Sequence, residues 1–108
     1  VLEKDRLKLI KEAKDNEKAG VFSIVVECVA ANVAREITQN LKIPTIGIGA
    51  SIHCDGQILV TDDMLGLSGF YPRFVKKFVR LNNIIEKGVQ KYNKAVLTKK
   101  FPSNKNKF

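Results

Sequence analysis

The chain has 108 residues, of which 44% are hydrophobic, and a formal net charge of +8 at pH 7. This length suggests one domain or a piece of one, and this apolar content excludes a chain that is disordered throughout. No apolar run approaches the roughly 20 residues that a membrane-spanning helix needs, so the sequence contains no candidate for one.

The cysteines and the N-terminus bear on where the protein works. Cys28 and Cys54 lack a CxxC spacing, and we expect reduced thiols in a cytoplasmic protein. The first residue is Val1 rather than Met, and no signal-peptide pattern follows it. We therefore expect the sequence to begin inside a longer reading frame.

Charge is distributed unevenly along the chain. Up to Asp63 there are ten acidic and eight basic residues, whereas after Asp63 eleven Lys/Arg residues accompany one acid, Glu86. A basic segment of this kind binds nucleic acid or another polyanion in some proteins and forms a solvated helical surface in others. Because aromatic stacking repeats are absent and Arg is scarce beside Lys, we do not expect nucleic acid as a partner.

The first half of the chain alternates helical and strand patterns. Residues 4–18 carry a weak apolar stripe in a charged background, which predicts a helix. Residues 21–26 form a continuous β-branched run, typical of a strand buried on both faces of a parallel sheet. A second helix is predicted over residues 31–41 and a second strand over residues 45–50, since Pro44 prevents the helix from continuing.

The second half begins with a third strand, predicted over residues 57–60 after an Asp-Gly turn. Residues 71–81 are amphipathic and predict a helix, and a last helix is predicted over residues 84–97, where apolar residues recur every three to four positions. Phe101-Pro102 closes this helix, and we expect residues 103–108 to form a mobile tail. The alternation along the chain indicates successive βα units and an α/β fold.

The predicted sheet leaves an architectural problem. Three parallel strands with helices outside them have open edges, and open edges on apolar strands favour pairing or aggregation. A closed (β/α)8 barrel has no edges but takes about 250 residues. The chain therefore either folds as a small open sheet or pairs with a remainder.

The stretch around which the chain is organised is the apolar run 24–26, which ends on the carboxylate of Glu27. A strand that carries a charged side chain at its C-terminal tip is the usual way in which an α/β enzyme places a catalytic acid or base. The alternative is a salt-bridged residue at a strand end, and position alone does not separate the two.

Four blocks carry a family resemblance: residues 26–29 (VECV), 43–50 (IPTIGIGA), 54–60 (CDGQILV) and 63–67 (DMLGL). In this order and at these separations they closely resemble ketopantoate hydroxymethyltransferase, also called 3-methyl-2-oxobutanoate hydroxymethyltransferase. Residues 72–76 (PRFVK) and Phe101-Pro102 resemble its C-terminal helices and tail. The resemblance covers essentially the whole chain but only a C-terminal portion of the family.

The resemblance implies a TIM barrel of which this chain supplies the last three βα units, so that residues 1–108 form one partial domain. It implies transfer of a one-carbon unit from 5,10-methylenetetrahydrofolate to 3-methyl-2-oxobutanoate, giving 2-dehydropantoate on the route to pantothenate and coenzyme A. The family uses a divalent metal, typically Mg²⁺, whose carboxylate ligands we expect in the N-terminal part. The implied protein partners are a separate N-terminal fragment and, in the complete enzyme, further copies of the chain.

By the same resemblance, the family's proton-transferring glutamate maps to Glu27. The substrate must lose a proton from the carbon next to its ketone, and a positioned carboxylate can take that proton while a metal stabilises the enolate. Partial burial at a strand end would make Glu27 a stronger base. No cofactor-binding residue and no metal ligand is assigned in this chain.

The chain departs from the family pattern at several positions. The family often has Pro where this chain has Ala30, Gly where it has Ser51 and His where it has Asp62. Ser51 would restrict its loop if that position needed positive φ. The usually acidic tail is Lys- and Asn-rich at residues 103–107. These departures affect loop geometry and substrate closure, and they resemble drift in a copy under relaxed constraint.

Two cysteine-containing clusters have weaker functional readings. His53, Cys54 and Asp55 are adjacent but match no zinc-ligand spacing, and we expect an ordinary loop there. Cys28 lies beside Glu27, but His53 is distant in sequence and no nucleophilic triad is evident.

Gly47 and Gly49 are compatible with a phosphate cradle, but we expect them to allow close packing where a strand meets its loop. The carboxylate pair Asp62 and Asp63 is expected to order the rim of the active site rather than to bind metal.

Three hypotheses follow. The chain is the C-terminal piece of a transferase that works with an N-terminal piece; or it is an inactive remnant of a disrupted or split gene; or it is a small basic binding module.

Overall fold

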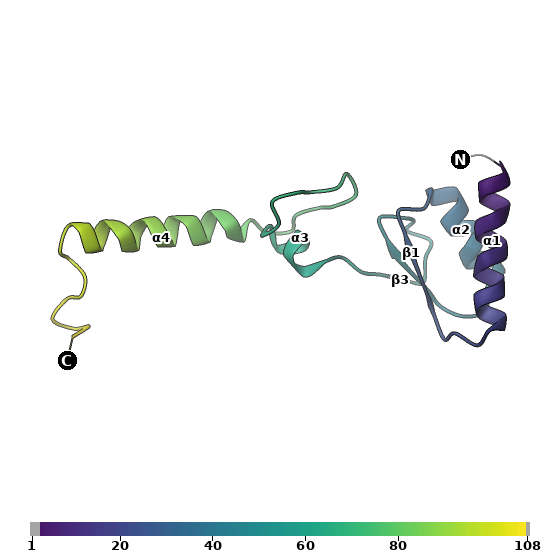
Figure 1. Ribbon diagram of the computed structural model, residues 1–108, viewed down its shortest axis with the longest axis horizontal. Helices are drawn as coiled ribbons and strands as arrows, with labels where there is room; N and C mark the ends of the chain where they lie inside the picture. Colours follow the sequence, from purple (N-terminus) through teal and green to yellow (C-terminus); the bar gives the residue numbers. More distant parts are fainter. Residues whose placement is uncertain (1–2, 108) are drawn as a thin grey trace. The chain divides into compact units, whose positions relative to one another are not determined.

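The computed structural model describes residues 3–107, and Val1, Leu2 and Phe108 lie outside the described residues. The ends of the predicted domain and of the predicted tail therefore fall outside it. The order of elements is α1 (Glu3–Lys18), β1 (Ile24–Glu27), α2 (Ala31–Asn40), β2 (Thr45–Ile48), β3 (Gly56–Gln57), α3 (Thr61–Leu65) and α4 (Leu81–Leu97) (Figure 1).

The chain divides into two compact units, each described here by itself. The N-terminal unit comprises residues 1–60 and 71–75, and the C-terminal unit comprises residues 61–70 and 76–108. The sheet and all of the buried apolar side chains in the described chain belong to the N-terminal unit.

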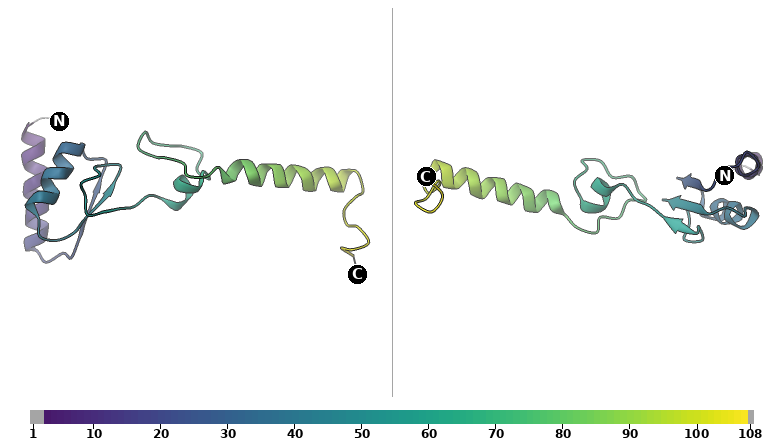
Figure 2. Two further views of the ribbon diagram at one scale, coloured as in Figure 1. Left: turned by 180° about the vertical axis from the view of Figure 1, so that it is seen from behind. Right: turned by 90° about the horizontal axis from the view of Figure 1, so that it is seen from below.

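The sheet has three parallel strands in the order β1-β2-β3, drawn as arrows that point the same way in Figure 2. Ile24 aligns with Thr45 and Glu27 with Ile48, so β1 and β2 pair along their full length. β3 is shorter and aligns Gly56 with Ile46. The predicted α/β class with a small parallel sheet is thus confirmed.

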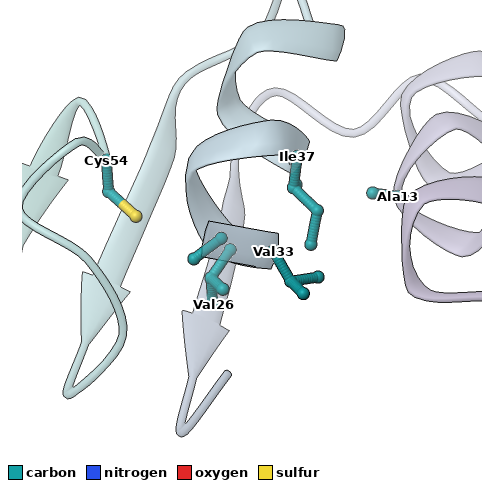
Figure 3. Close-up of a cluster of buried hydrophobic side chains, with 6 residues drawn as sticks. Ala13, Val26, Val33, Ile37 and Cys54 are labelled. Atoms are coloured by element: carbon teal, nitrogen blue, oxygen red, sulfur yellow. The ribbon is translucent and has the colours of Figure 1, made fainter. Parts of the chain in front are cut away.

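The core of the N-terminal unit lies where α1 and α2 pack side by side against the sheet (Figure 1). The apolar positions of α2 fall on one helical face because they are spaced by one, three and four residues. Figure 3 shows the resulting cluster, to which α2 contributes half of the six side chains and the other elements one each: Val33, Ala34 and Ile37 from α2, Val26 from β1, Ala13 from α1 and Cys54 from the loop before β3.

Ala13 is the one buried residue of helix α1 among those described, Leu9 and Ile10 pack against the core, and polar contacts link both ends of the helix to its surroundings. The Arg6 guanidinium donates hydrogen bonds to Glu36 on α2 and to Glu3 on its own helix. Both hydrogen bonds raise the pKa of Arg6 above its ordinary value, and the bond to Glu3 has the larger effect. At the other end of the helix, the Glu17 carboxylate accepts the backbone N–H groups of Lys42 and Ile43, which ties α1 to the segment before β2.

Two glycines let β2 and its loop pack closely. An added Cβ at Gly47 would lie 2.9 Å from Gln57 Oε1 and 3.1 Å from Cys54 Sγ. At Gly49, whose φ is +61°, an added Cβ would lie 2.3 Å from the Phe74 ring. The expectation that these glycines serve close packing is confirmed.

The C-terminal unit contains α3 and α4. Asp62 and Asp63 occupy the first turn of α3, and the turn closes where the Gly66 N–H donates to the Asp63 carbonyl at 3.2 Å with φ of +74° at Gly66. α4 spans 17 residues without a buried side chain, and Tyr92 packs edge-on against Phe101 with ring centroids 5.6 Å apart.

The end of the chain was predicted to be a mobile tail. Residues 103–106 form a turn in which the Asn106 N–H donates to the Ser103 carbonyl at 2.9 Å. The mobility of this segment stays a prediction.

The predicted helix over residues 71–81 is wrong. Residues 71–80 are mostly irregular, with one turn at residues 73–74, and α4 begins at Leu81. The Phe78 N–H donates to the Met64 carbonyl at 2.9 Å instead of to a carbonyl four residues earlier. An amphipathic pattern makes a stable helix only where an apolar surface receives it, and Phe78 remains 67% exposed.

The predicted third strand over residues 57–60 is also wrong in its bounds, since β3 ends at Gln57. The Ile58 N–H makes one more bond, to the Gly47 carbonyl at 2.9 Å. The pairing then stops because β2 turns away at Gly49, which leaves later residues without a partner strand. Helix α3 was not predicted, although Asp62 and Asp63 followed by Gly66 give a helix start and stop signal.

We predict that Val33→Ala lowers the free energy of unfolding by about 2 kcal/mol, because it removes two fully buried methyl groups and leaves a cavity. Urea unfolding followed by circular dichroism measures this change. Val89→Ala on α4 is the matched control, since Val89 is 60% exposed and should change stability by less than about 0.5 kcal/mol. Equal effects of the two substitutions would contradict the assigned core.

We also predict that Gly49→Ala destabilises the chain more than Gly20→Ala. Both glycines have positive φ, which costs an alanine about 1–2 kcal/mol. Only Gly49 lies against another side chain, Phe74, whereas nothing lies within 4 Å of a Cβ added at Gly20. Overpacking adds about 1–3 kcal/mol at Gly49, measurable in the same unfolding assay. Equal losses would rule out the Phe74 contact.

Candidate functional site

Glu27 is the last residue of β1 and lies opposite Ile48, the last residue of β2. The strands are parallel, so their carboxyl ends meet at one edge of the sheet. This edge is where ligands bind in α/β enzymes with parallel sheets. The structure therefore places Glu27 at this edge of the sheet.

The backbone turns sharply directly after Glu27. Cys28 has φ of +52°, which is uncommon for a residue other than glycine. Its N–H donates to the Ile48 carbonyl at 3.1 Å, so the pairing of β1 with β2 continues through this strained residue. Strained backbone of this kind clusters at functional sites, and it fixes the direction in which the chain leaves Glu27 toward α2.

Alternation along β1 sorts its side chains onto two faces. Val26 is buried against the helices, whereas Val25 and Glu27 fall on the other face and are both exposed. Glu27 is therefore not partly buried in this chain, because none of the described elements of the N-terminal unit covers that face. Val25 is 55% exposed for the same reason.

A cleft of about 250 Å³ runs beside β1 and includes Glu27 in its wall. We call it the α1–β1 cleft. Its other wall is α1, and its lining is mostly apolar with two carboxylates and one amide: Leu9, Glu12, Ala13, Asn16, Ile24, Val25, Val26, Glu27, Val29 and Ile37.

The loop after β2 is held by polar contacts around Ser51. The Ser51 hydroxyl accepts the His53 N–H at 3.2 Å, and its carbonyl accepts the Gln57 side-chain amide at 2.7 Å. Positive φ in this loop occurs at Gly49 and not at Ser51. The hydroxyl-bearing residue therefore does not strain the backbone here.

The other two departures from the family pattern also sit without strain. Ala30 precedes α2 with φ of −53° and ψ of 136°, a conformation that proline also adopts, and its carbonyl accepts the Ala34 N–H at 2.9 Å. Asp62 is exposed in the first turn of α3, where acidic residues are favoured.

His53, Cys54 and Asp55 have separate surroundings. His53 is exposed, and Cys54 is buried in the apolar core. The Asp55 carboxylate accepts the backbone N–H of Thr45 at 2.8 Å and its hydroxyl at 3.2 Å. The expectation of an ordinary loop rather than a metal site is in keeping with this arrangement.

Sequence reasoning missed a polar clamp at the amino ends of the strands. Thr45 is fully buried, and its hydroxyl lies 2.8 Å from that of Thr38 on α2 and accepts the Asp55 N–H at 3.3 Å. Buried polar groups need such partners. The clamp joins β2, α2 and the start of β3, and the signal for it was the Asp-Gly pair that begins β3.

The described residues do not fit a magnesium site. Residues 3–107 contain no group of three His, Cys, Asp or Glu side chains that could hold a metal ion.

Cys28 and Cys54 are both free, one exposed and the other buried. Of the described helices, none has the length and apolar character to cross a bilayer.

A sequence profile of the ketopantoate hydroxymethyltransferase family matches residues 2–104. The chain is 48% identical over 104 residues to the 3-methyl-2-oxobutanoate hydroxymethyltransferase of Pelagibacter ubique, covering 96% of this chain and 40% of that protein. It is 54% identical over 99 residues to 3-methyl-2-oxobutanoate hydroxymethyltransferase 2 of Zymomonas mobilis, covering 92% and 36%.

A relative from Clostridium botulinum with the same hydroxymethyltransferase name is 50% identical over 107 residues, covering 98% of this chain and 39% of its own length. The chain thus spans about two-fifths of the length of the curated relatives that it matches. On this evidence the chain belongs to the ketopantoate hydroxymethyltransferase family.

Proposed function

We propose that this chain is the Glu27-bearing part of an enzyme that transfers a hydroxymethyl group to 3-methyl-2-oxobutanoate, with 5,10-methylenetetrahydrofolate as the one-carbon donor and 2-dehydropantoate as the product. The observation that carries the proposal is the position of Glu27 at the carboxyl end of a parallel strand, in a chain of this family. The reaction belongs to pantothenate biosynthesis.

The proposed architecture is the C-terminal part of a TIM barrel. Three parallel strands with helices against them supply the expected βα pattern. The face that carries Val25 and Glu27 is uncovered in the N-terminal unit. In a barrel this face points inward and is covered by the other strands. This assignment treats the described residues as one partial domain in the intact enzyme.

Glu27 acts as the general base in this proposal. The proton on the carbon next to the ketone of 3-methyl-2-oxobutanoate passes to the Glu27 carboxylate, and the resulting enolate carbon forms a bond to the methylene carbon of the donor. The two bonds from that carbon to the folate nitrogens break, water supplies the hydroxyl group, and tetrahydrofolate leaves. A base that transfers a proton in the transition state contributes about 10²–10⁴-fold to the rate. Among the described residues the Glu27 side chain is exposed.

The proposed roles of this chain's residues in the reaction do not include binding of Mg²⁺. The described residues do not offer a carboxylate cluster, so Mg²⁺ would have to be held elsewhere in the intact enzyme, where it would stabilise the enolate. The residues that contact the folate donor are likewise unassigned.

A direct experiment uses the portion of the Pelagibacter ubique relative that this chain does not match. That portion and this chain are co-expressed, and formation of 2-dehydropantoate is measured with both substrates and Mg²⁺. Product that requires both polypeptides supports the proposal. A soluble complex that makes no product would instead favour an inactive remnant of a split or disrupted gene.

We predict that Glu27→Gln lowers kcat of the active mixture by at least about 100-fold, because the amide cannot accept the proton. The steady-state rate of 2-dehydropantoate formation measures this. Glu86→Gln on the exposed surface of α4 is the matched control and should leave the rate unchanged. An unchanged rate for Glu27→Gln, with the circular dichroism spectrum preserved, would refute the role of Glu27 as the base.

A further inference from the structure

Among residues 3–107, two residues other than glycine have positive φ: Cys28 at 52° and Lys99 at 56°. The left-handed conformation carries a steric cost for every residue with a Cβ atom, so the surrounding contacts must hold it in place. At Lys99 the conformation has a common cause, since Lys99 follows α4 and helices often end on a left-handed residue. At Cys28 no helix ends, and the conformation needs another explanation.

The turn at Cys28 reverses the alternation of side chains that β1 begins. In a strand that continued as extended chain, Val26 and Cys28 would share the core face, and Glu27 and Val29 the opposite face. Instead Cys28 is exposed, whereas Val29 packs against the same core as Val26. The left-handed residue therefore lets the chain return to the core directly after Glu27, while Glu27 itself stays on the exposed face.

Contacts on both sides fix this turn. Before it, the Cys28 N–H donates to the Ile48 carbonyl at 3.1 Å, which extends the pairing with β2 past the end of β1. After it, Val29 and Ala30 pack against the core, and the Ala30 carbonyl accepts the Ala34 N–H at 2.9 Å where α2 begins. Cys28 is exposed, so burial of its thiol is not what holds the turn.

We infer that Cys28 is a positioning residue for Glu27 and acts through its left-handed backbone rather than through its thiol. This inference rests on the proposed function, in which Glu27 is the base, and adds the device that holds Glu27 opposite Ile48. A side chain that opposes the left-handed conformation forces the turn to release one of its two anchors. Releasing the N–H of residue 28 from Ile48 costs one hydrogen bond, whereas releasing Val29 and Ala30 withdraws the start of α2 from the core. The end of β1 therefore gives way first, and Glu27 moves with it.

Three substitutions separate the backbone of Cys28 from its thiol. Cys28→Gly and Cys28→Asn both remove the thiol, and glycine and asparagine adopt the left-handed conformation more readily than other residues. Cys28→Val also removes the thiol, but a β-branched residue at positive φ is a genuine outlier. We expect the first two variants to behave as the unaltered chain does and Cys28→Val to differ from it.

The first measurement uses the chain alone and needs no substrate. Hydrogen exchange followed by NMR reports the protection factor of the amide of residue 28, and cross-strand NMR contacts report whether Glu27 stays opposite Ile48. In Cys28→Val we expect this protection factor to fall at least about 10-fold and the contact between Glu27 and Ile48 to be lost. In Cys28→Gly and Cys28→Asn both should stay as they are in the unaltered chain.

The second measurement is steady-state formation of 2-dehydropantoate by the co-expressed mixture described above. We expect Cys28→Val to lower kcat at least about 10-fold with little change in KM for 3-methyl-2-oxobutanoate, because a displaced base affects proton transfer more than substrate binding. Cys28→Gly and Cys28→Asn should retain kcat. When Glu27→Gln is already present, Cys28→Val should lower the remaining rate no further, because the effects of residues that act as a unit are not additive.

Lys99→Val is the matched control, because it places the same β-branched side chain at the other non-glycine residue of positive φ in the described chain. It should destabilise the end of α4 and leave unchanged both the protection factor at residue 28 and kcat.

Normal protection at residue 28 together with normal kcat in Cys28→Val would overturn the inference. An equal loss of kcat in Cys28→Gly and Cys28→Asn would also overturn it, since the thiol would then carry the role. The same holds for an equal loss in Lys99→Val, or for an undiminished effect of Cys28→Val when Glu27→Gln is present.

The inference and the proposed function fail in different measurements. An unchanged rate in Glu27→Gln, with residue 28 behaving as expected in the chain alone, would refute the proposed function alone. If the mixture makes no product, the protection factor and the cross-strand contact decide by themselves whether Cys28 holds Glu27 in place.

Discussion

The parallel pairing of β1 with β2, from Ile24 opposite Thr45 to Glu27 opposite Ile48, is the constraint on which the candidate site depends. It sets the carboxyl ends of two strands at one edge and continues one residue further through the Cys28 N–H. A shift of one residue in this register would move Glu27 to the opposite face of the sheet. The buried side chain of Val26 opposes such a shift, because it would then lose its place in the core.

Both ends of the sheet are fixed by contacts outside the strands themselves. At the amino ends, Asp55 accepts two hydrogen bonds from Thr45 and so holds the start of β3 beside β2. At the carboxyl ends, Gly49 turns against Phe74, and Gln57 binds the Ser51 carbonyl. The loop between β2 and β3 is therefore anchored at both ends of its path, which leaves the edge near Glu27 well defined.

The N-terminal unit is covered on one side only. Helices α1 and α2 bury Val26, while Val25 and Glu27 remain exposed on the other face. Exposed apolar side chains, an open strand edge and a cleft along that edge occur together at β1. Parallel sheets are stable when both faces and their edges are satisfied. The exposure of Glu27 and the open edge of β1 thus lie on the side of the N-terminal unit that its helices do not cover.

The sequence alone determined the α/β class, the two helices of the N-terminal unit, the position of β1 and β2, and Glu27 as the residue at a strand tip. These features follow from local patterns: apolar periodicity in α2, β-branched runs in the strands, and a carboxylate directly after such a run. The length of β3, the absence of a helix over residues 71–80, the Thr45–Asp55 clamp and the exposure of Glu27 were decided by tertiary structure. Each depends on a partner distant in the chain: β3 ends where β2 turns away, an amphipathic segment needs a surface to pack on, and a buried hydroxyl needs an acceptor. Local sequence patterns carry no information about whether that partner is present.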